Sequence, residues 1–372
     1  MKLVTVIGAR PQFIKAAAVS RAIQKYNQEN SCTRVQEIIV HTGQHYDHNM
    51  SQIFFDELEI RKPDYYLDVG SGRHGEMTGT MLTKIEKVLI KETPDSVLVY
   101  GDTNSTLAGA LAAVKVHIPV SHIEAGLRSF NRQMPEEINR VLTDHMSTFL
   151  FCPTDAAVKN LKKEGVTKNV FKVGDVMLDS FLYNKRLAVK KSLILSKLDI
   201  NPKTYCLVTV HREENTTNWK RITGIFEAIN KLATHDCPFI VPLHPRTLKA
   251  LNKLGNNSLY GPYVRIIEPI SYLDMVLLEI YAKVILTDSG GVQKEACFAK
   301  TPCITLRNET EWVELVENGY NVIAGCDPDK ICYAFEEIVD KPIHIDPELY
   351  GRGRASEKIV SLLRSISSQE VR

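Results

Sequence analysis

The sequence predicts an α/β protein built from two doubly wound halves that face each other across a cleft. Short apolar stretches that stop abruptly at polar residues indicate strands buried on both faces of a parallel sheet. Helical stretches alternate with them, for example at residues 106–117 and 218–233, as in parallel α/β folds. A chain of 372 residues also exceeds the size at which one hydrophobic core keeps growing, so two domains are expected.

The predicted strands form two groups along the chain. The first group lies within residues 3–11, 37–45, 96–104, 118–126 and 148–155. The second group lies within residues 205–215, 238–247, 264–270 and 283–291. Ligands of open parallel sheets bind at the carboxyl ends of the strands, so we expect the functional residues there.

The stretch between the groups, residues 182–205, is lysine-rich and has no strand-end motif, so it is the candidate linker. We therefore expect an N-terminal domain at residues 1–185, a C-terminal domain at 186–350 and a C-terminal helix at 351–372. The last segment carries apolar residues with the spacing of an amphipathic helix, at Ile359, Leu362, Leu363 and Ile366.

Composition narrows the class of protein. The net charge of +2 is too small for a surface that coats nucleic acid. The N-terminus lacks the apolar run of a signal peptide, and no stretch approaches the ~18 apolar residues of a membrane span. The eight cysteines contain no C-x-x-C pair, which disfavours a zinc ribbon. We expect a cytoplasmic protein without membrane insertion.

The stretch "LTDSGGVQKEA" is the first candidate binding motif. Ser289, Gly290 and Gly291 lead from a strand into a helix whose free N–H groups favour an anion. An ordinary capped helix start is the alternative. A capping box from Ser289 would need Glu or Gln at Val292, so capping does not account for Glu295, which could accept hydrogen bonds from sugar hydroxyls.

Two cations in "GARPQFIK" also indicate an anionic ligand. Arg10 follows a strand, and Lys15 lies in the first turns of the next helix, where the helix dipole disfavours a cation. The alternative is that both are surface residues. The chain has neither a G-x-G-x-x-G fingerprint nor a G-x-x-x-x-G-K-[ST] loop, which disfavours dinucleotide dehydrogenases and P-loop NTPases.

Acidic residues at strand ends indicate acid–base chemistry. Asp102 and Glu124 end neighbouring predicted strands, and Glu136 follows soon after. Close carboxylates separate each other's pKa values, as proton transfer in both directions requires. Asp102 could instead cap a helix, and Glu136 could form a surface pair with Arg140.

Strand-end histidines are the last candidates. His211 and His244 can donate to a phosphate or move a proton, or they can be structural hydrogen bonders. The stretch "HTGQHYDHN" suggests a metal site through its histidines and Asp47, but such residues are often only hydrogen-bonding groups. We expect no metal.

Eight blocks of the chain together resemble a known family. In order they are "GARPQFIK", "TGQHYD", "GDTNSTLAGALAA", "HIEAGLRS", "MPEEINR", "HREEN", "LHPRT" and "LTDSGGVQKEA". They are similar to the blocks of the non-hydrolysing UDP-N-acetylglucosamine 2-epimerases. The resemblance implies a GT-B-like fold of two Rossmann-like domains, with the C-terminal helix crossing back to the first. It also implies a homodimer and no metal or nicotinamide cofactor.

The resemblance implies roles for particular residues. The group expected around the sugar and diphosphate is Arg10, Lys15, Asp102, Glu124, Glu136 and His211. The group expected at UDP is His244, Ser289, Gly290, Gly291 and Glu295. Arg140 and Gln44 complete the expected substrate-binding set, and Gln44 with His45 would form the allosteric UDP-GlcNAc site of some bacterial members.

Two departures from the family pattern concern the substrate. The family's usual E-R-P-E reads "ETEWVE" at residues 309–314, and "FNRQM" precedes Pro135. They resemble the branch that acts on UDP-2,3-diacetamido-2,3-dideoxyglucuronate in surface-polysaccharide synthesis, and UDP-N-acetylglucosamine stays open as the substrate. A hydrolysing 2-epimerase, a GT-B glycosyltransferase and a non-catalytic nucleotide-sugar-binding regulator remain alternatives.

Overall fold

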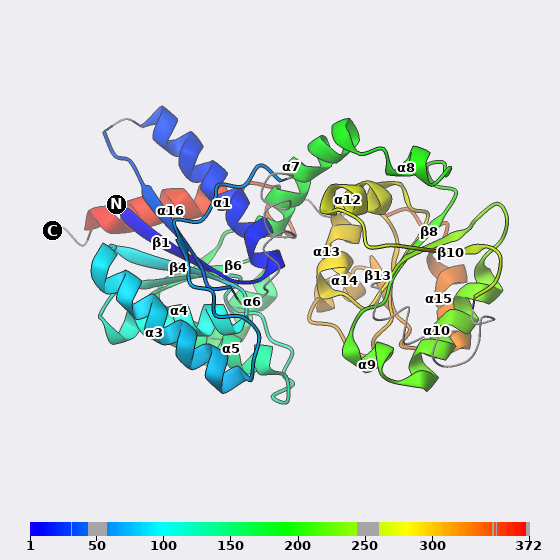
Figure 1. Cartoon of the computed structure of the whole chain (residues 1–372), viewed down its shortest axis with the longest axis horizontal. Helices are drawn as coiled ribbons and strands as arrows, with labels where there is room; N and C mark the ends of the chain where they lie inside the picture. The colour runs from blue at the N-terminus through cyan, green and yellow to red at the C-terminus, as the bar shows by residue number, and fades with distance from the viewer. Residues whose placement is uncertain (31, 44–57, 244–259, 344–345, 347, 370–372) are drawn as a thin grey trace. The chain divides into compact units, whose positions relative to one another are not determined.

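The computed structural model describes residues 1–30, 32–43, 58–243, 260–343, 346 and 348–369. The chain divides into two compact units (Figure 1). The first contains Met1–Leu182 and Pro347–Arg372, and the second contains Tyr183–Asp346. The chain thus leaves the first unit once and returns to it for its last segment.

The first unit is built on a parallel sheet. Seven strands among the described residues have the order β3-β2-β1-β4-β5-β6-β7, and every neighbouring pair is parallel. They are β1 (Lys2–Ile7), β2 (Gln36–His41), β3 (Tyr65–Tyr66), β4 (Ser96–Tyr100), β5 (Val120–Ile123), β6 (Phe149–Cys152) and β7 (Val170–Lys172). Strands β1, β4 and β5 are neighbours, so the residues after them emerge at one edge of the sheet.

Helices connect these strands. They are α1 (Arg10–Glu29), α3 (His74–Glu92), α4 (Asn104–Lys115), α5 (Pro135–Met146) and α6 (Asp155–Lys163). Successive strand residues face opposite sides, and Val4, Val6, Val97 and Val99 pack with the apolar residues of α3 and α4 in one core cluster. This packing fixes where the strands end and therefore where the loops at the sheet edge begin.

The second unit repeats the architecture. Its sheet among the described residues has six strands in the order β10-β9-β8-β11-β12-β13, all parallel. They are β8 (Cys206–Thr209), β9 (Phe239–Pro242), β10 (Val264–Ile267), β11 (Ile285–Thr287), β12 (Cys303–Thr305) and β13 (Asn321–Ile323). The helices are α8 (Ile194–Lys197), α9 (Glu213–Thr216), α10 (Trp219–Leu232), α12 (Tyr272–Tyr281), α13 (Gly290–Ala299), α14 (Val313–Glu317) and α15 (Pro328–Ile338).

The prediction of an α/β fold with two parallel sheets is confirmed. Each apolar stretch expected to be a strand contains one. Four further strands of two or three residues, β3, β7, β12 and β13, were not predicted.

The predicted linker is largely helical. Helix α7 (Val176–Lys191) contains the break between Leu182 and Tyr183, and α8 follows it. Lys190 and Lys191 are exposed residues in the last turn of α7, where they suit the helix dipole, and Lys197 belongs to α8.

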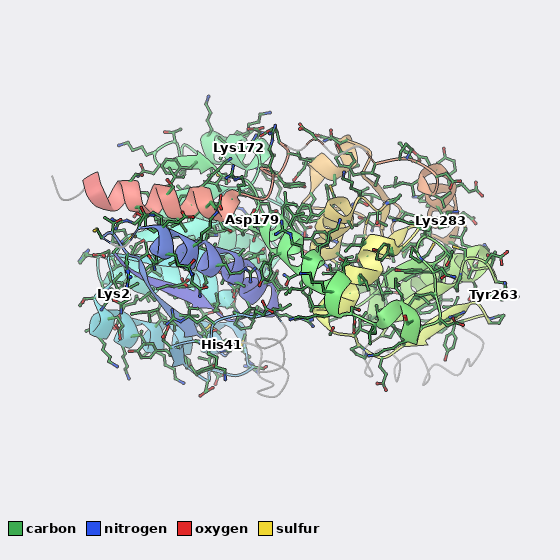
Figure 2. All side chains as sticks on the ribbon, turned by 90° about the horizontal axis from the view of Figure 1, so that it is seen from above. Lys2, His41, Lys172, Asp179, Tyr263 and Lys283 are labelled. Atoms are coloured by element: carbon green, nitrogen blue, oxygen red, sulfur yellow. The ribbon has the colours of Figure 1, made fainter. Side chains whose placement is uncertain are left out.

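The C-terminal helix α16 (Ala355–Gln369) is part of the first unit and packs against α1 (Figure 1). Asp179 of α7, labelled in Figure 2, accepts hydrogen bonds from the first backbone N–H groups of α16, those of Ala355 at 3.1 Å and Ser356 at 2.7 Å. These donors have no acceptor within their own helix, so Asp179 fixes the start of α16. The last helix is therefore held by both side-chain capping and apolar packing.

Candidate active site

The carboxyl edge of the first sheet carries a buried ion pair. Lys15 of α1 binds the Glu124 carboxylate, which follows β5. The pair lies above Gly101, whose φ of +63° favours glycine and where an added Cβ would lie 3.1 Å from Glu124 Oε2. Glu124 itself has a φ of +70°, a costly conformation for a non-glycine residue. The structure therefore brings Lys15 and Glu124 together, as a functional site at this edge requires.

Asp102 and Arg140 form a second charged pair at the same edge. Arg140 of α5 donates to Asp102 Oδ2 at 2.5 Å and to Glu137 Oε2 at 2.9 Å. Asp102 is not a helix cap, because Thr103 caps α4 by accepting from the Thr106 N–H. Glu136 is exposed in the first turn of α5 and makes no ion pair with Arg140, whose partner on this helix is Glu137. The surface-pair alternative for Glu136 is thus wrong.

Glu137, the neighbour of Glu136, has a structural role. It is buried and accepts from the Ser129 N–H, the Ser129 hydroxyl and the Phe130 N–H, each at 2.9 Å. Burial raises its pKa, but these bonds and the Arg140 guanidinium outweigh burial and hold the pKa below its ordinary value. Glu137 is therefore a fixed carboxylate that shapes the loop before α5.

Gln12 is a positioning residue that the sequence analysis missed. Its Oε1 accepts from the backbone N–H groups of Gly8 at 2.8 Å and Ala9 at 3.0 Å. Its Nε2 donates to the Tyr100 carbonyl at 2.8 Å and to Thr106 Oγ1 at 2.9 Å. The buried amide of Gln12 thus links the loop that leads to Arg10, the first residue of α1, with the loop that carries Asp102. Its place in the "RPQF" motif was the available signal.

The S-G-G turn at the edge of the second sheet fits both the capped helix start and the anion site that the sequence suggests. Ser289 caps α13, its side chain accepting from the Val292 N–H at 3.5 Å. Gly290 and Gly291 are the first helical residues, so their N–H groups have no acceptor within the helix and point at the position an anion would take. The turn is both a capped helix start and a set of free donors.

Asp288, which precedes the turn, holds the neighbouring strand end. Its buried carboxylate accepts from the backbone N–H groups of His211 at 3.2 Å and Arg212 at 3.1 Å, and from Asn215 Nδ2 at 3.0 Å. His211 follows β8, the neighbour of β11, and its side chain is 58% exposed. The imidazole of His211 is therefore available to a ligand beside the S-G-G turn.

The "ETEWVE" segment packs on α13. An added Cβ on Gly290 would lie 2.1 Å from Glu311 Oε1 and 3.4 Å from Trp312 Nε1, so a larger residue there requires the Glu311 carboxylate to shift. Thr310 donates to Gln293 Oε1 at 2.6 Å, and Lys294 Nζ lies 4.1 Å from the Trp312 ring centroid. The segment that departs from the family pattern thus contacts the helix of the S-G-G turn.

Glu295 is buried in α13 and accepts from the Tyr272 hydroxyl at 2.5 Å. Glu279 of α12 is also buried, and neither of its carboxylate oxygens has a hydrogen-bond partner in the described structure. Burial, and secondly the charge of Glu295, raises the pKa of Glu279 well above its ordinary value. Glu279 lies in the last turn of α12, where its backbone carbonyl accepts from the Thr301 hydroxyl at 2.8 Å, so this carboxyl group is away from the strand ends that carry the S-G-G turn.

Some predicted residues lie outside the described residues, namely Gln44, His45, Asp47, His48, His244 and Arg246. His41, from the same motif as His45, is buried and stacks on Phe13 with ring centroids 4.9 Å apart. Within the described ranges, no three His, Cys, Asp or Glu side chains come together in a metal-binding arrangement.

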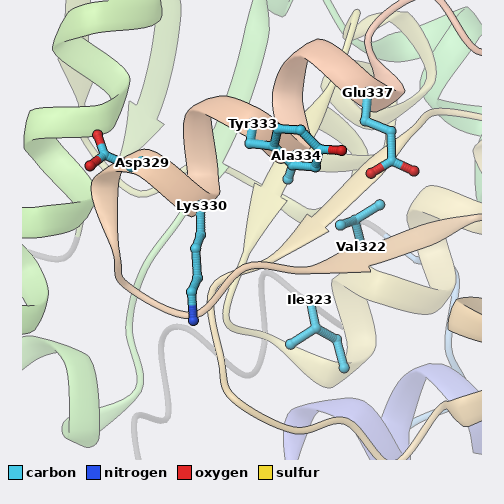
Figure 3. A pocket seen from close by; sticks show the side chains of 7 residues that line it. All are labelled: Val322, Ile323, Asp329, Lys330, Tyr333, Ala334 and Glu337. Carbon is cyan, nitrogen blue, oxygen red and sulfur yellow. The ribbon is translucent and has the colours of Figure 1, made fainter.

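A separate hollow of about 350 Å³ lies between β13 and α15 (Figure 3). Val322, Ile323, Tyr333 and Glu337 are among its lining residues, and none of the predicted site residues is.

Among the described helices, none combines the length and apolar content that a membrane crossing requires.

Comparison with known proteins identifies the family. The family model for UDP-N-acetylglucosamine 2-epimerase matches residues 27–364. The chain belongs to this family. It is therefore a UDP-sugar 2-epimerase, an isomerase. The family predicted from the eight blocks is confirmed.

Individual relatives cover nearly the whole epimerase. A UDP-N-acetylglucosamine 2-epimerase homolog of Methanococcus maripaludis is 52% identical over 98% of this chain and 100% of its own length. The UDP-2,3-diacetamido-2,3-dideoxy-D-glucuronate 2-epimerase of Pseudomonas aeruginosa is 51% identical over the same shares. The Methanocaldococcus jannaschii UDP-GlcNAc 2-epimerase, solved in complex with UDP-GlcNAc and UDP, is 46% identical, covers 98% of this chain and 99% of its own, and has a TM-score of 0.86. The GT-B-like class is confirmed by this likeness.

Proposed function

We propose that the epimerase inverts C2 of a UDP-N-acetylhexosamine by eliminating and re-adding UDP. The C2 hydrogen has no adjacent carbonyl, so its direct removal is very unfavourable. Loss of UDP from C1 with removal of the C2 proton gives a 2-acetamidoglucal and UDP. Re-addition of UDP at C1, with protonation of C2 from the opposite face, gives the epimer. Elimination and re-addition together change no oxidation state overall, so the reaction needs no nicotinamide cofactor.

Proton transfer is assigned to the first unit. The observation that carries the assignment is the pair of carboxylates at adjacent strand ends, Asp102 held by Arg140 and Glu124 held by Lys15. General acid–base catalysis needs such groups in fixed positions. Glu136, which makes no ion pair in the described structure, is the third candidate for this work.

The second unit is assigned to UDP. The free N–H groups of Gly290 and Gly291 would bind the diphosphate, and the exposed His211 would donate to it or protonate the departing oxygen. Glu295 would bind the ribose. Arg10 and Lys15, at the start of α1, would offset the charge that develops on the leaving diphosphate.

The substrate proposed first is UDP-2,3-diacetamido-2,3-dideoxyglucuronate, used in surface-polysaccharide synthesis. The P. aeruginosa relative named for this substrate is 51% identical. UDP-N-acetylglucosamine is the second candidate, because the 46% identical M. jannaschii structure holds it. Incubation of the enzyme with each in parallel, followed by NMR of the C2 configuration, decides between them.

Turnover in deuterated water tests the mechanism. Proton NMR is expected to show deuterium at C2 of the product, with UDP still attached to the sugar. Product without deuterium at C2 would exclude elimination. Free UDP with free sugar would instead indicate the hydrolysing reaction, and exchange only in the presence of an acceptor sugar would indicate a transferase.

We also propose that the enzyme is a cytoplasmic homodimer, as the family resemblance implies. Light scattering coupled to size-exclusion chromatography tests the oligomeric state. A mass of about 42 kDa, that of one chain, would contradict the proposal.

A further inference from the structure

His122 of β5 is fully buried between two hydrogen-bond acceptors. Its Nδ1 lies 2.7 Å from Asp144 Oδ1, and its Nε2 lies 2.8 Å from the carbonyl oxygen of Gly101. Burial opposes ionisation of Asp144, but the hydrogen bond from His122 and the Arg128 guanidinium hold the pKa of Asp144 below its ordinary value. The ring therefore bridges a carboxylate and a backbone carbonyl oxygen, both of which are hydrogen-bond acceptors.

Asp144 anchors this ring and the loop after β5. Besides His122 it accepts from the Gly126 N–H at 3.0 Å and from Arg128 Nη1 at 2.7 Å. Arg128 in turn donates to both carboxylate oxygens of Glu164, each at 2.7 Å. A continuous chain of bonds, buried as far as Arg128, thus runs from the Gly101 carbonyl to Glu164, the C-cap of α6.

The two nitrogens of the His122 ring contact the two loops that carry the proposed proton-transfer groups, Nε2 directly at Gly101 and Nδ1 through Asp144, which binds Gly126. Asp102 is the residue after Gly101, and Glu124 follows His122 and Ile123. Glu124 has a φ of +70°, a conformation that a non-glycine residue keeps only when surrounding contacts hold it. His122 is itself too deeply buried to touch a substrate.

We propose that His122 is a positioning residue of the epimerase, whose Nε2–H bond to the Gly101 carbonyl fixes Asp102 relative to Glu124. Asp144 holds the ring in the orientation that this bond requires. The inference rests on the proposed function, in which these carboxylates move the C2 proton. A misplacement of about 1 Å in such a site can reduce the rate about 10²-fold.

Two substitutions separate the two bonds of the ring. In His122→Gln the side-chain amide nitrogen takes the place of Nε2 and can still donate to Gly101. In His122→Asn it takes the place of Nδ1 and can donate only to Asp144. We expect kcat for C2 deuterium exchange to fall about 10²-fold in H122N and less than about tenfold in H122Q, with KM within about threefold in both.

Ser96→Ala is the matched control. Ser96 lies at the other end of the β4 and β5 pair and bonds the Pro119 carbonyl and Ser121 Oγ, each at 3.2 Å. This variant should lower the melting temperature without changing kcat. The three variants are compared at one temperature below the melting point of the weakest.

Equal rates for H122N and H122Q, or a slower H122Q, would overturn the positioning role. If H122N does not fold, H122Q decides alone, because a folded H122Q with a 10²-fold loss contradicts the inference. Absence of C2 exchange in the unmodified enzyme is a different result, since it refutes the proposed function and not the geometry.

Discussion

The carboxyl edges of the two sheets carry different kinds of polar group. The first edge has charged side chains in opposed pairs, Lys15 with Glu124 and Arg140 with Asp102. The second has backbone N–H donors of the S-G-G turn, with Asp288 holding the adjacent strand end. Fixed carboxylates suit proton transfer, and neutral donors at a helix start suit a phosphate. The same parallel architecture therefore supports two different chemical tasks.

The largest expected effect follows from neutralising one carboxylate at the first edge. Asp102→Asn should reduce C2 exchange by about 10²–10⁴-fold, because the amide cannot take or return a proton. UDP binding, assigned to the other unit, should persist and can be measured by calorimetry.

Asp95→Asn is the control for Asp102→Asn. Asp95 precedes β4, whereas Asp102 lies beyond its carboxyl end, and Asp95 Oδ2 accepts from the Lys2 N–H at 2.6 Å. Exchange should stay near the wild-type rate in D95N. A wild-type rate in D102N would remove Asp102 from the mechanism and erase the contrast between the two edges.

An intermediate effect is expected at the second edge. Gly290→Ala places a methyl group 2.1 Å from Glu311 Oε1, whereas at Gly291 the nearest atom to an added Cβ is Ser289 Oγ at 3.8 Å. Overpacking should destabilise G290A by about 1–3 kcal/mol. G291A should be neutral or slightly stabilised, because alanine favours a helix by about 1 kcal/mol over glycine.

Thermal and urea unfolding of the two glycine variants measure this difference. Equal stability of G290A and G291A would show that Glu311 moves aside freely and that the turn has no fixed neighbour. A loss confined to G290A would show that the "ETEWVE" segment sets the shape of the anion site.

The smallest expected effect is a change in melting temperature on replacing either of two buried glutamates, one in each unit. Glu279 in the second unit has no hydrogen-bond partner on its carboxylate in the described structure, whereas Glu37 in the first accepts from Thr5 at 2.8 Å and Ser20 at 2.6 Å. Burial raises the pKa of both. A carboxyl group with a raised pKa in the folded state destabilises the fold as pH rises above the pKa of the unfolded chain, because only the unfolded chain then ionises freely.

Glu279→Gln should therefore raise the melting temperature by a few degrees at neutral pH, and the gain should vanish near pH 4. Glu37→Gln should gain less, because the amide cannot accept from both hydroxyls as well as the carboxyl group does. Melting curves of both variants across pH 4–8 test this. A gain for E279Q that is independent of pH would rule out ionisation as the cause.

Much of this arrangement could be predicted because parallel strands bring their ends together. The sequence predicts Asp102, Glu124, His211 and Ser289 as strand-end residues, and the structure places them at the edges of the two sheets. Such a choice depends only on the apolar run that precedes each residue. The short strands β12 and β13 lacked that signal, although β12 pairs directly with β11.

The bonds between elements could not be predicted. The partner of Asp102 is Arg140 and the partner of His122 is Asp144, and both partners lie in α5. His122 lies within a buried strand, so the residues next to it in the sequence do not indicate its hydrogen-bonding role. The spacing of Glu136 and Arg140 suggested a pair, but the register of α5 on the sheet selects Glu137 instead.

The return of α16 to the first unit has a consequence for how the chain is made. Domains tend to form as their residues leave the ribosome. The second unit is continuous from Tyr183 to Asp346, so its residues all emerge before α16 does. The first unit, in which α1 packs against α16, can be completed only after the whole second unit has emerged. The domain that carries the proposed proton-transfer residues is begun first and finished last.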